Sequence, residues 1–308
     1  MSDNEDDQPK VVEVPEEPGK RFFISHMNSY TGRVLLEELK NADKVKEEYA
    51  AHSFQGTIQE GTSSWYTLKS NELPEGVEKI VKMQRTREFR ESILDSDVII
   101  YDLMTNDFEE VDYVIKTLKT SKLTSEKTLI IMSSVMTWVN TPPKLQIEGE
   151  EPEAAEGEEG AEPEEEEEEE PEEGEEVPEE AEGDEDKPKP PKVLFFKETD
   201  SHLRVPHERF ILHKNLETLA LSAPKTQPML KVHVLCAGIR YGYGEGIFAD
   251  HFRKAWIQTP EQLTIIGKGD NFVPTIHIRD LSRCIKKMVD DKIKKEYIFA
   301  VDKTKKPT

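Results

Sequence analysis

The segment that most constrains the fold lies near the start of the chain and reads FFISHMNSYTGRVLLEEL, residues 22–39. The apolar run at 22–24 predicts a strand, and the apolar residues at 34–36 and 39 recur near the period of a helix. Only a short loop separates the two, so the segment predicts a strand that turns directly into a helix. Such a unit must bury one helix face against a sheet, which requires further strands and helices.

The rest of the chain continues this alternation. The runs DVIIYDL and TLIIMSS are almost entirely apolar, which is typical of parallel strands that are covered on both faces. TREFRESILDS and NDFEEVDYVIKTLKTSK predict amphipathic helices around them. Further along, a long helix is predicted over 205–223 and a buried strand in LKVHVLCAGI. Strands that alternate with helices predict an α/β fold with a doubly wound parallel sheet.

The charge of the chain is concentrated in one internal segment. The 308 residues carry a formal charge of −23. Of the 64 acidic residues, 25 lie in 148–186, a segment that has no Lys or Arg. In the rest of the chain the other 39 acidic residues nearly balance the 41 Lys and Arg residues. Such an acidic segment cannot bury enough apolar surface to fold. We therefore predict one domain formed by 20–147 and 193–308, with a disordered insertion at 148–192 and a disordered acidic arm at 1–19.

The acidic insertion has two interpretations. It is either a solvated spacer or a docking segment for a basic protein partner, and it argues against nucleic acid as a ligand because phosphates would be repelled. The two cysteines show no disulfide pattern, and Cys236 ends an apolar run, which predicts a buried thiol. Because the sequence shows no signal peptide and no apolar run of membrane-spanning length, we expect a cytoplasmic protein without membrane contact.

Several motifs follow one another in a characteristic order. They are the loop in FFISHMNSYTG, the serine pair in MSSVMTWVN, and the segments RFILHK, CAGIRYGYGEG and IIGKGDNFVPTIHIRDLSRCI. In this order and spacing they resemble the extended short-chain dehydrogenase/reductase family, of the NAD-dependent epimerase/dehydratase type. The resemblance covers about residues 21–303 apart from the insertion, and it implies a Rossmann-like fold.

The resemblance also implies a cofactor loop with three glycines, each separated by two residues, that brings the backbone close to a pyrophosphate. His26, Ser29 and Gly32 occupy the three places, so only the third glycine is present. Two interpretations follow: a structural turn in which Ser29 or Asn28 caps the helix, or an altered nucleotide site at the helix start. HSFQGTIQ offers no carboxylate for a cofactor ribose, which favours the structural turn.

The family's catalytic serine, tyrosine and lysine correspond to Ser134, Phe210 and Lys214. In the family the lysine lowers the pKa of the tyrosine, which transfers the proton. Phe210 has no hydroxyl group, so we expect no catalytic residues and no bound cofactor. NAD(P) or another nucleotide, held by the altered loop and Lys214, remains the alternative.

The histidines lack the spacing of zinc ligands, so we expect no metal. No P-loop motif occurs, so we expect any kinase activity to lie beyond residue 308. The chain is also similar to the N-terminal region of adenylate kinases of motile cilia and sperm flagella, where an epimerase-like domain precedes a kinase domain. That similarity implies a non-catalytic module for scaffolding or assembly in the axoneme, with axonemal or other ciliary proteins as partners. The alternatives are an atypical NAD(P)-dependent epimerase or reductase, and a nucleotide sensor without turnover.

Overall fold

The computed structural model describes residues 19–43, 52–59, 76–105, 107–145, 193–244, 246–259, 262, 265, 268–269 and 272–303. The predicted disorder of 1–19 and 148–192 lies outside these residues, except for Gly19, and stays a prediction. The chain divides into two units, 142–197 and the remainder. In the smaller unit, β6 (Lys144–Leu145) and β7 (Val193–Leu194) form an antiparallel pair.

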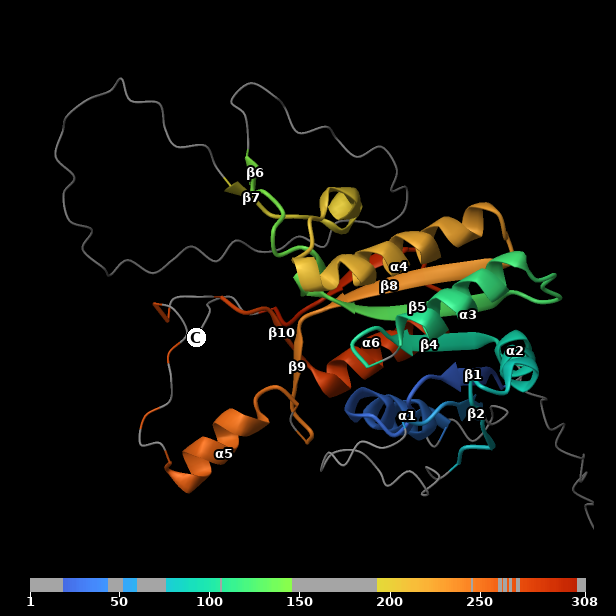
Figure 1. Ribbon diagram of the computed structural model, residues 1–308, viewed down its shortest axis with the longest axis horizontal. Coiled ribbons are helices and arrows are strands. Elements are labelled where there is room, and N and C mark those ends of the chain that lie inside the picture. The colour runs from blue at the N-terminus through green and yellow to red at the C-terminus, as the bar shows by residue number, and fades with distance from the viewer. Residues whose placement is uncertain are drawn as a thin grey trace, which may run out of the picture. The chain divides into compact units, whose positions relative to one another are not determined.

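The larger unit contains a seven-stranded parallel sheet in the order β11-β8-β5-β4-β1-β2-β3 (Figure 1). The strands are β1 (Arg21–Ile24), β2 (Ser53–Gly56), β3 (Lys79–Ile80), β4 (Val98–Asp102), β5 (Lys127–Ser134), β8 (Leu230–Ala237) and β11 (Tyr297–Ala300). The chain reverses its direction of travel across the sheet between β1 and β4, which is where ligands bind in sheets of this type. The predicted Rossmann-like parallel sheet is thus confirmed.

Helices cover the sheet on both faces. α1 packs against α6, whereas α3 packs against both α2 and α4. The helices are α1 (Tyr30–Asp43), α2 (Thr86–Asp95), α3 (Phe108–Thr120), α4 (Ile211–Ser222), α5 (Ala249–Ile257) and α6 (Ile278–Asp290). Two short strands, β9 (Ile239–Tyr241) and β10 (Thr275–His277), pair in parallel beside the main sheet. No helix in the described ranges is long and apolar enough to cross a membrane.

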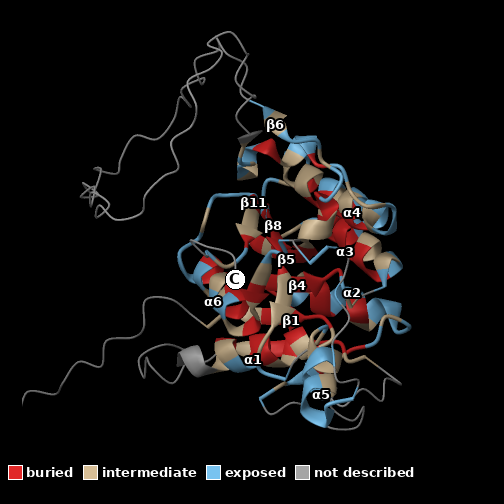
Figure 2. Ribbon diagram, turned by 90° about the vertical axis from the view of Figure 1, so that its left-hand side faces the viewer, coloured by how far each residue is buried: buried red, intermediate tan, exposed pale blue. Residues whose placement is uncertain are grey.

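The apolar runs form strands because both of their faces are covered. Every residue of β4 is buried, as are all but two residues of β5 (Figure 2). On one face Phe22 packs with Phe54 of the next strand, and on the other Phe23 meets Phe89 of α2 edge to face. Each fully buried side chain of this size contributes about 1.5–3 kcal/mol. Packing on both faces therefore fixes the register of the strand that leads into the candidate site.

The helix predicted over 205–223 is shorter than expected. α4 begins only at Ile211, after the 3-10 turns η2 (Glu198–Leu203) and η3 (Glu208–Phe210). Pro206 disfavours helical geometry at Val205, and His207 caps the separate 3-10 turn η3, so α4 begins only after that turn. As a result Phe210 lies at the N-cap of α4, with φ −111° and ψ 11°, and not inside the helix.

Candidate functional site

The loop between β1 and α1 lies at the carboxyl edge of the sheet, and His26 opens it in the left-handed conformation, with φ 47°. A glycine adopts this conformation without steric cost, which is the function of the first glycine in the related loops. His26 keeps the turn because Thr57, just after β2, supports it: the His26 amide donates to Thr57 Oγ1 at 2.9 Å. The tight turn is therefore retained although its glycine is not.

Ser29 and Asn28 both have structural roles in this loop. Ser29 Oγ accepts a hydrogen bond from the Gly32 amide at 3.0 Å and so caps α1. Asn28 donates to the carbonyl of Gln59 at 2.9 Å and accepts from the Gln59 amide at 2.7 Å, which joins the loop to the segment after β2. The structural interpretation therefore accounts for both residues, and the cap occupies one of the amides that could meet an anion.

Gly32 is required by close packing. A Cβ atom at this position would lie 2.3 Å from the carbonyl oxygen of His26 and 2.9 Å from Cα of Met27. Backbone atoms cannot move aside as a flexible side chain can. Gly32 therefore keeps the packing function of the third glycine in the loop motif.

A buried ion pair lies at the point where the sheet order reverses. Arg240, on β9, pairs with Asp102, the last residue of β4, and their side chains are 10% and 3% exposed. Arg240 Nη1 also donates to Thr31 Oγ1 at 2.9 Å, in the first turn of α1. This pair was not predicted from the sequence. The sequence indicates it only through an arginine in a segment whose pattern predicts a strand. The pair brings a cation to the place where related folds bind a pyrophosphate.

Two histidines are partly or wholly buried near Asp102. Burial lowers the pKa of His26 and of His213 below the ordinary histidine value, although the negative charge of Asp102 opposes the shift. The neutral forms of both rings are therefore favoured near pH 7. A histidine kept neutral in this way does not add positive charge to the site.

The catalytic positions of the family hold structural side chains. The ring of Phe210 packs on the ring of His213, with 4.6 Å between their centroids, and Phe108 meets the same histidine at 4.9 Å. Lys214 Nζ donates to the carbonyl of Arg204 at 2.8 Å. The positions that the resemblance matches to the family's tyrosine and lysine therefore hold an aromatic cluster and a lysine that is bonded to the backbone.

Ser134 and its neighbour Ser133 are also bonded within the protein. Ser134 Oγ accepts from the Met136 amide at 3.3 Å and caps the 3-10 turn η1 (Val135–Thr137). The Ser133 hydroxyl donates to Glu217 of α4, which is paired with Arg204. Because α4 packs on both β5 and η1, the structure brings Ser134 and the start of α4 into one region, as the fold predicts.

The chemistry that this region can support follows from these contacts. Phe210, which the resemblance places at the family's tyrosine position, has no group that could donate or accept a proton. In the described ranges no group of three or more His, Cys, Asp or Glu residues could hold a metal ion. The loop also does not fit a pyrophosphate as the family loop does, because side chains stand at two glycine places and Ser29 takes the Gly32 amide. The residues described at this site therefore do not fit the chemistry of a nicotinamide cofactor.

Comparison with solved structures defines the class of the fold. dTDP-glucose 4,6-dehydratase from Bacillus anthracis, solved in complex with NAD, matches with a TM-score of 0.59 and 14% identity over 94% of this chain and 77% of that chain. UDP-N-acetylglucosamine 4-epimerase from Bacillus cereus matches with a TM-score of 0.53 and 9% identity over 92% of this chain and 78% of that chain. No family model matches the chain. At these identities the likeness concerns the fold alone, which is the Rossmann-like fold of the extended short-chain dehydrogenases.

Comparison with curated proteins gives a particular relative, adenylate kinase 7. The mouse protein, from Mus musculus, is 26% identical over 213 residues, which are 68% of this chain and 28% of that protein. The protein of Macaca fascicularis is 32% identical over 90 residues, 29% of this chain and 17% of that protein. The similarity to an adenylate kinase that was expected from the sequence is confirmed, and the chain spans less than a third of these relatives.

Proposed function

We propose that this chain is a non-catalytic Rossmann-like module of a longer adenylate kinase, and that it serves in scaffolding or assembly. Phe210 is the main support for this proposal, because at the position of the family's proton-transferring tyrosine it presents a ring that packs on His213. The bond from Lys214 to the carbonyl of Arg204 supports it, since the second group of the catalytic pair also has a structural partner. The nucleoside monophosphate kinase activity would then belong to the rest of the protein.

The test of this proposal is a direct measurement of cofactor binding and turnover. We expect calorimetry with NAD⁺, NADH, NADP⁺ and NADPH to show no saturable binding at micromolar concentration. We also expect no change of nicotinamide absorbance with nucleotide sugars as substrates. Micromolar binding would contradict the inert module, and turnover would establish an atypical epimerase or reductase in its place.

The sequence resemblance motivates the finer part of the proposal, a site of action in the axoneme of cilia or flagella with axonemal proteins as partners. The acidic insertion at 148–192 would then meet a basic segment of such a partner. Tagged full-length protein should co-purify with detergent-extracted axonemes, and deletion of 148–192 should weaken that association. Protein that washes out completely with the soluble fraction would contradict this assignment.

A nucleotide sensor without turnover is the second candidate, and unsatisfied polar atoms favour it. Arg240 Nη2 and His26 Nδ1 are buried and have no hydrogen-bond partner among the residues that the structure describes. Buried polar atoms without partners are uncommon, and a bound ligand, ion or water is one explanation for them. A sensor would raise its melting temperature with one nucleotide, and Arg240→Gln would abolish that shift. Equal shifts in the wild type and in Arg240→Gln would exclude this role for Arg240.

A further inference from the structure

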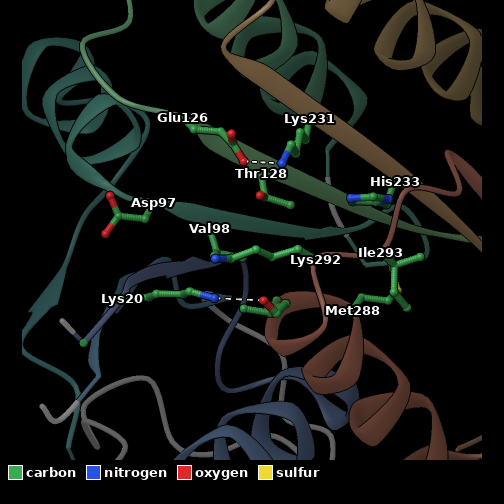
Figure 3. Close-up of a pocket in the computed structure, with 12 residues that line it drawn as sticks. Lys20, Asp97, Val98, Glu126, Thr128, Lys231, His233, Met288, Lys292 and Ile293 are labelled. Atoms are coloured by element: carbon green, nitrogen blue, oxygen red, sulfur yellow. Dashed lines mark hydrogen bonds and ion pairs between the residues drawn. The ribbon is translucent and has the colours of Figure 1, made fainter. Parts of the chain in front are cut away.

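A separate cavity lies at the opposite edge of the sheet, where the parallel strands begin (Figure 3). Its volume is about 390 Å³, within the usual range for small-molecule sites, roughly 300–1,000 Å³. Residues just before or near the start of four strands line it, together with the end of α6. The Rossmann ligand site lies at the carboxyl edge, so this cavity is independent of the site described above.

Cationic side chains predominate around this cavity. Lys20, Lys231 and Lys292 line it, against two carboxylates, Asp97 and Glu126. Figure 3 shows the side chain of Lys292 lying across the cavity, between Val98 and Lys20. The lining groups alone therefore carry a net positive charge.

Both carboxylates in the lining have cationic partners. Asp97 accepts three hydrogen bonds from Arg21, from its amide at 2.9 Å, Nε at 3.2 Å and Nη2 at 3.0 Å. Burial opposes the ionisation of Asp97, but the hydrogen bonds from Arg21 keep its pKa below the ordinary value, so it stays charged and neutralised. Glu126 is paired with Lys231. The same contacts engage two of the lysines, because Lys231 is the partner of Glu126 and Lys20 Nζ donates to the carbonyl of Val289 at 2.8 Å (Figure 3). An ammonium group has three N–H donors, so Lys20 can still donate to an anion, and the carboxylates that the anion meets are already compensated.

The remaining lining provides hydrogen-bonding groups and an apolar wall. Thr128 contributes a hydroxyl group, and His233 is bonded through Nδ1 to the carbonyl of Lys295 at 2.7 Å, which leaves Nε2 as its second polar atom. Met288 and Ile293 lie on the side formed by the end of α6 and the turn after it. Lysine and hydroxyl groups beside this apolar surface suit a ligand with one charged end and one apolar end.

We propose that this cavity binds a small organic anion, a carboxylate or phosphate group carried on a compact apolar body. The charged group would lie among Lys20, Lys292 and Thr128, and the apolar body would lie against Met288 and Ile293. The attraction follows from the net positive lining and strengthens as the ligand loses water in a partly enclosed site. The lysines make the site selective for charge, and the volume limits the ligand to a few rings or a short chain.

Two anionic probes test the proposal on the full chain: phenyl phosphate and benzoate, with uncharged benzyl alcohol as the comparison. Titration is followed by calorimetry and by the ¹³C-methyl resonance of Met288, assigned with Met288→Leu. We expect saturable shifts of this resonance with one or both anions and none with benzyl alcohol. The anion that binds more tightly identifies whether the natural ligand carries a phosphate or a carboxylate.

Two matched variants separate the cavity from general attraction to lysines. Lys292→Gln removes a charge from the lining, whereas Lys294→Gln removes one from outside it; both residues are exposed, so the two variants are matched. We expect Lys292→Gln to weaken anion binding about tenfold, which corresponds to about 1.4 kcal/mol, and Lys294→Gln to leave it unchanged. The proposal is overturned if neither anion shifts Met288, if benzyl alcohol binds equally well, or if both variants bind like the wild type or weaken equally.

Discussion

Replacing Arg204 with methionine should destabilise the protein by about 3–5 kcal/mol, because the charge of Glu217 would lose its partner. The side chains are 5% and 0% exposed, and Arg204 Nε lies 2.9 Å from Glu217 Oε2. Arg204 also donates to Thr218 Oγ1 at 3.1 Å and lies over the ring of Tyr297, 5.4 Å from its centroid. Domains of this kind are stable by about 5–15 kcal/mol, so the variant would keep only part of its stability.

The size of this loss should depend on pH. Burial raises the pKa of Glu217 above the ordinary carboxyl value, while the hydrogen bond from Ser133 and the charge of Arg204 oppose the rise. Removal of Arg204 raises that pKa further, so the folded variant holds a proton at pH values where the unfolded chain has released it. The loss is then smallest below the ordinary carboxyl pKa and grows as the pH rises through the pKa of the folded state.

Urea denaturation followed by circular dichroism at about pH 5 and about pH 7.5 measures both effects. The double variant Arg204→Met/Glu217→Leu is the control, because it removes both charges and should recover most of the stability. The reasoning would be refuted by a double variant as unstable as the sum of the single changes. A loss for Arg204→Met that does not change between the two pH values would refute it equally.

Three further predictions use single positions. Gly32→Ala should cost about 1–3 kcal/mol, because the new Cβ would lie 2.3 Å from a carbonyl oxygen; Gly246→Ala, whose nearest new contact is 3.7 Å, should leave the melting temperature almost unchanged. Phe210→Tyr should produce no NAD(P)-dependent turnover, since Lys214 is bonded elsewhere, and a measurable rate would contradict the assigned role of that lysine. Cys236 is buried and burial raises the pKa of its thiol to about 12, so iodoacetamide at about pH 8 should label it only after unfolding, as read by mass spectrometry.

The main strands and the alternation of strands and helices could be predicted from the sequence because they depend on local apolar patterns. β4 and β5 each contain a continuous apolar run, and the crossover from β1 to α1 combines a short apolar run with a pattern of period 3.6. The start of α4 could not be placed in the same way. The amphipathic pattern continues back toward Val205, but Pro206 and the η3 turn, which His207 caps, delay the start of the helix to Ile211.

Some features of the candidate site could likewise be predicted from the sequence, and others could not. The missing glycines and the missing hydroxyl of Phe210 are visible in the sequence, and the cap by Ser29 was one of two interpretations that it allowed. The ion pair of Arg240 with Asp102 joins residues 138 positions apart. No local pattern pairs these residues, since they meet only where the chain that follows β8 passes the end of β4.

By itself, the sequence indicated the class of fold. Through the family resemblance it also indicated altered glycine places in the β1 to α1 loop and a phenylalanine at the place of the tyrosine. Each of these depends on residue type and spacing along the chain. The tertiary structure alone decided what the altered positions do now. His26 keeps a left-handed turn through Thr57, and Lys214 binds a carbonyl. These roles depend on contacts between distant segments, and such contacts exist only once the sheet has formed and its helices have packed on it.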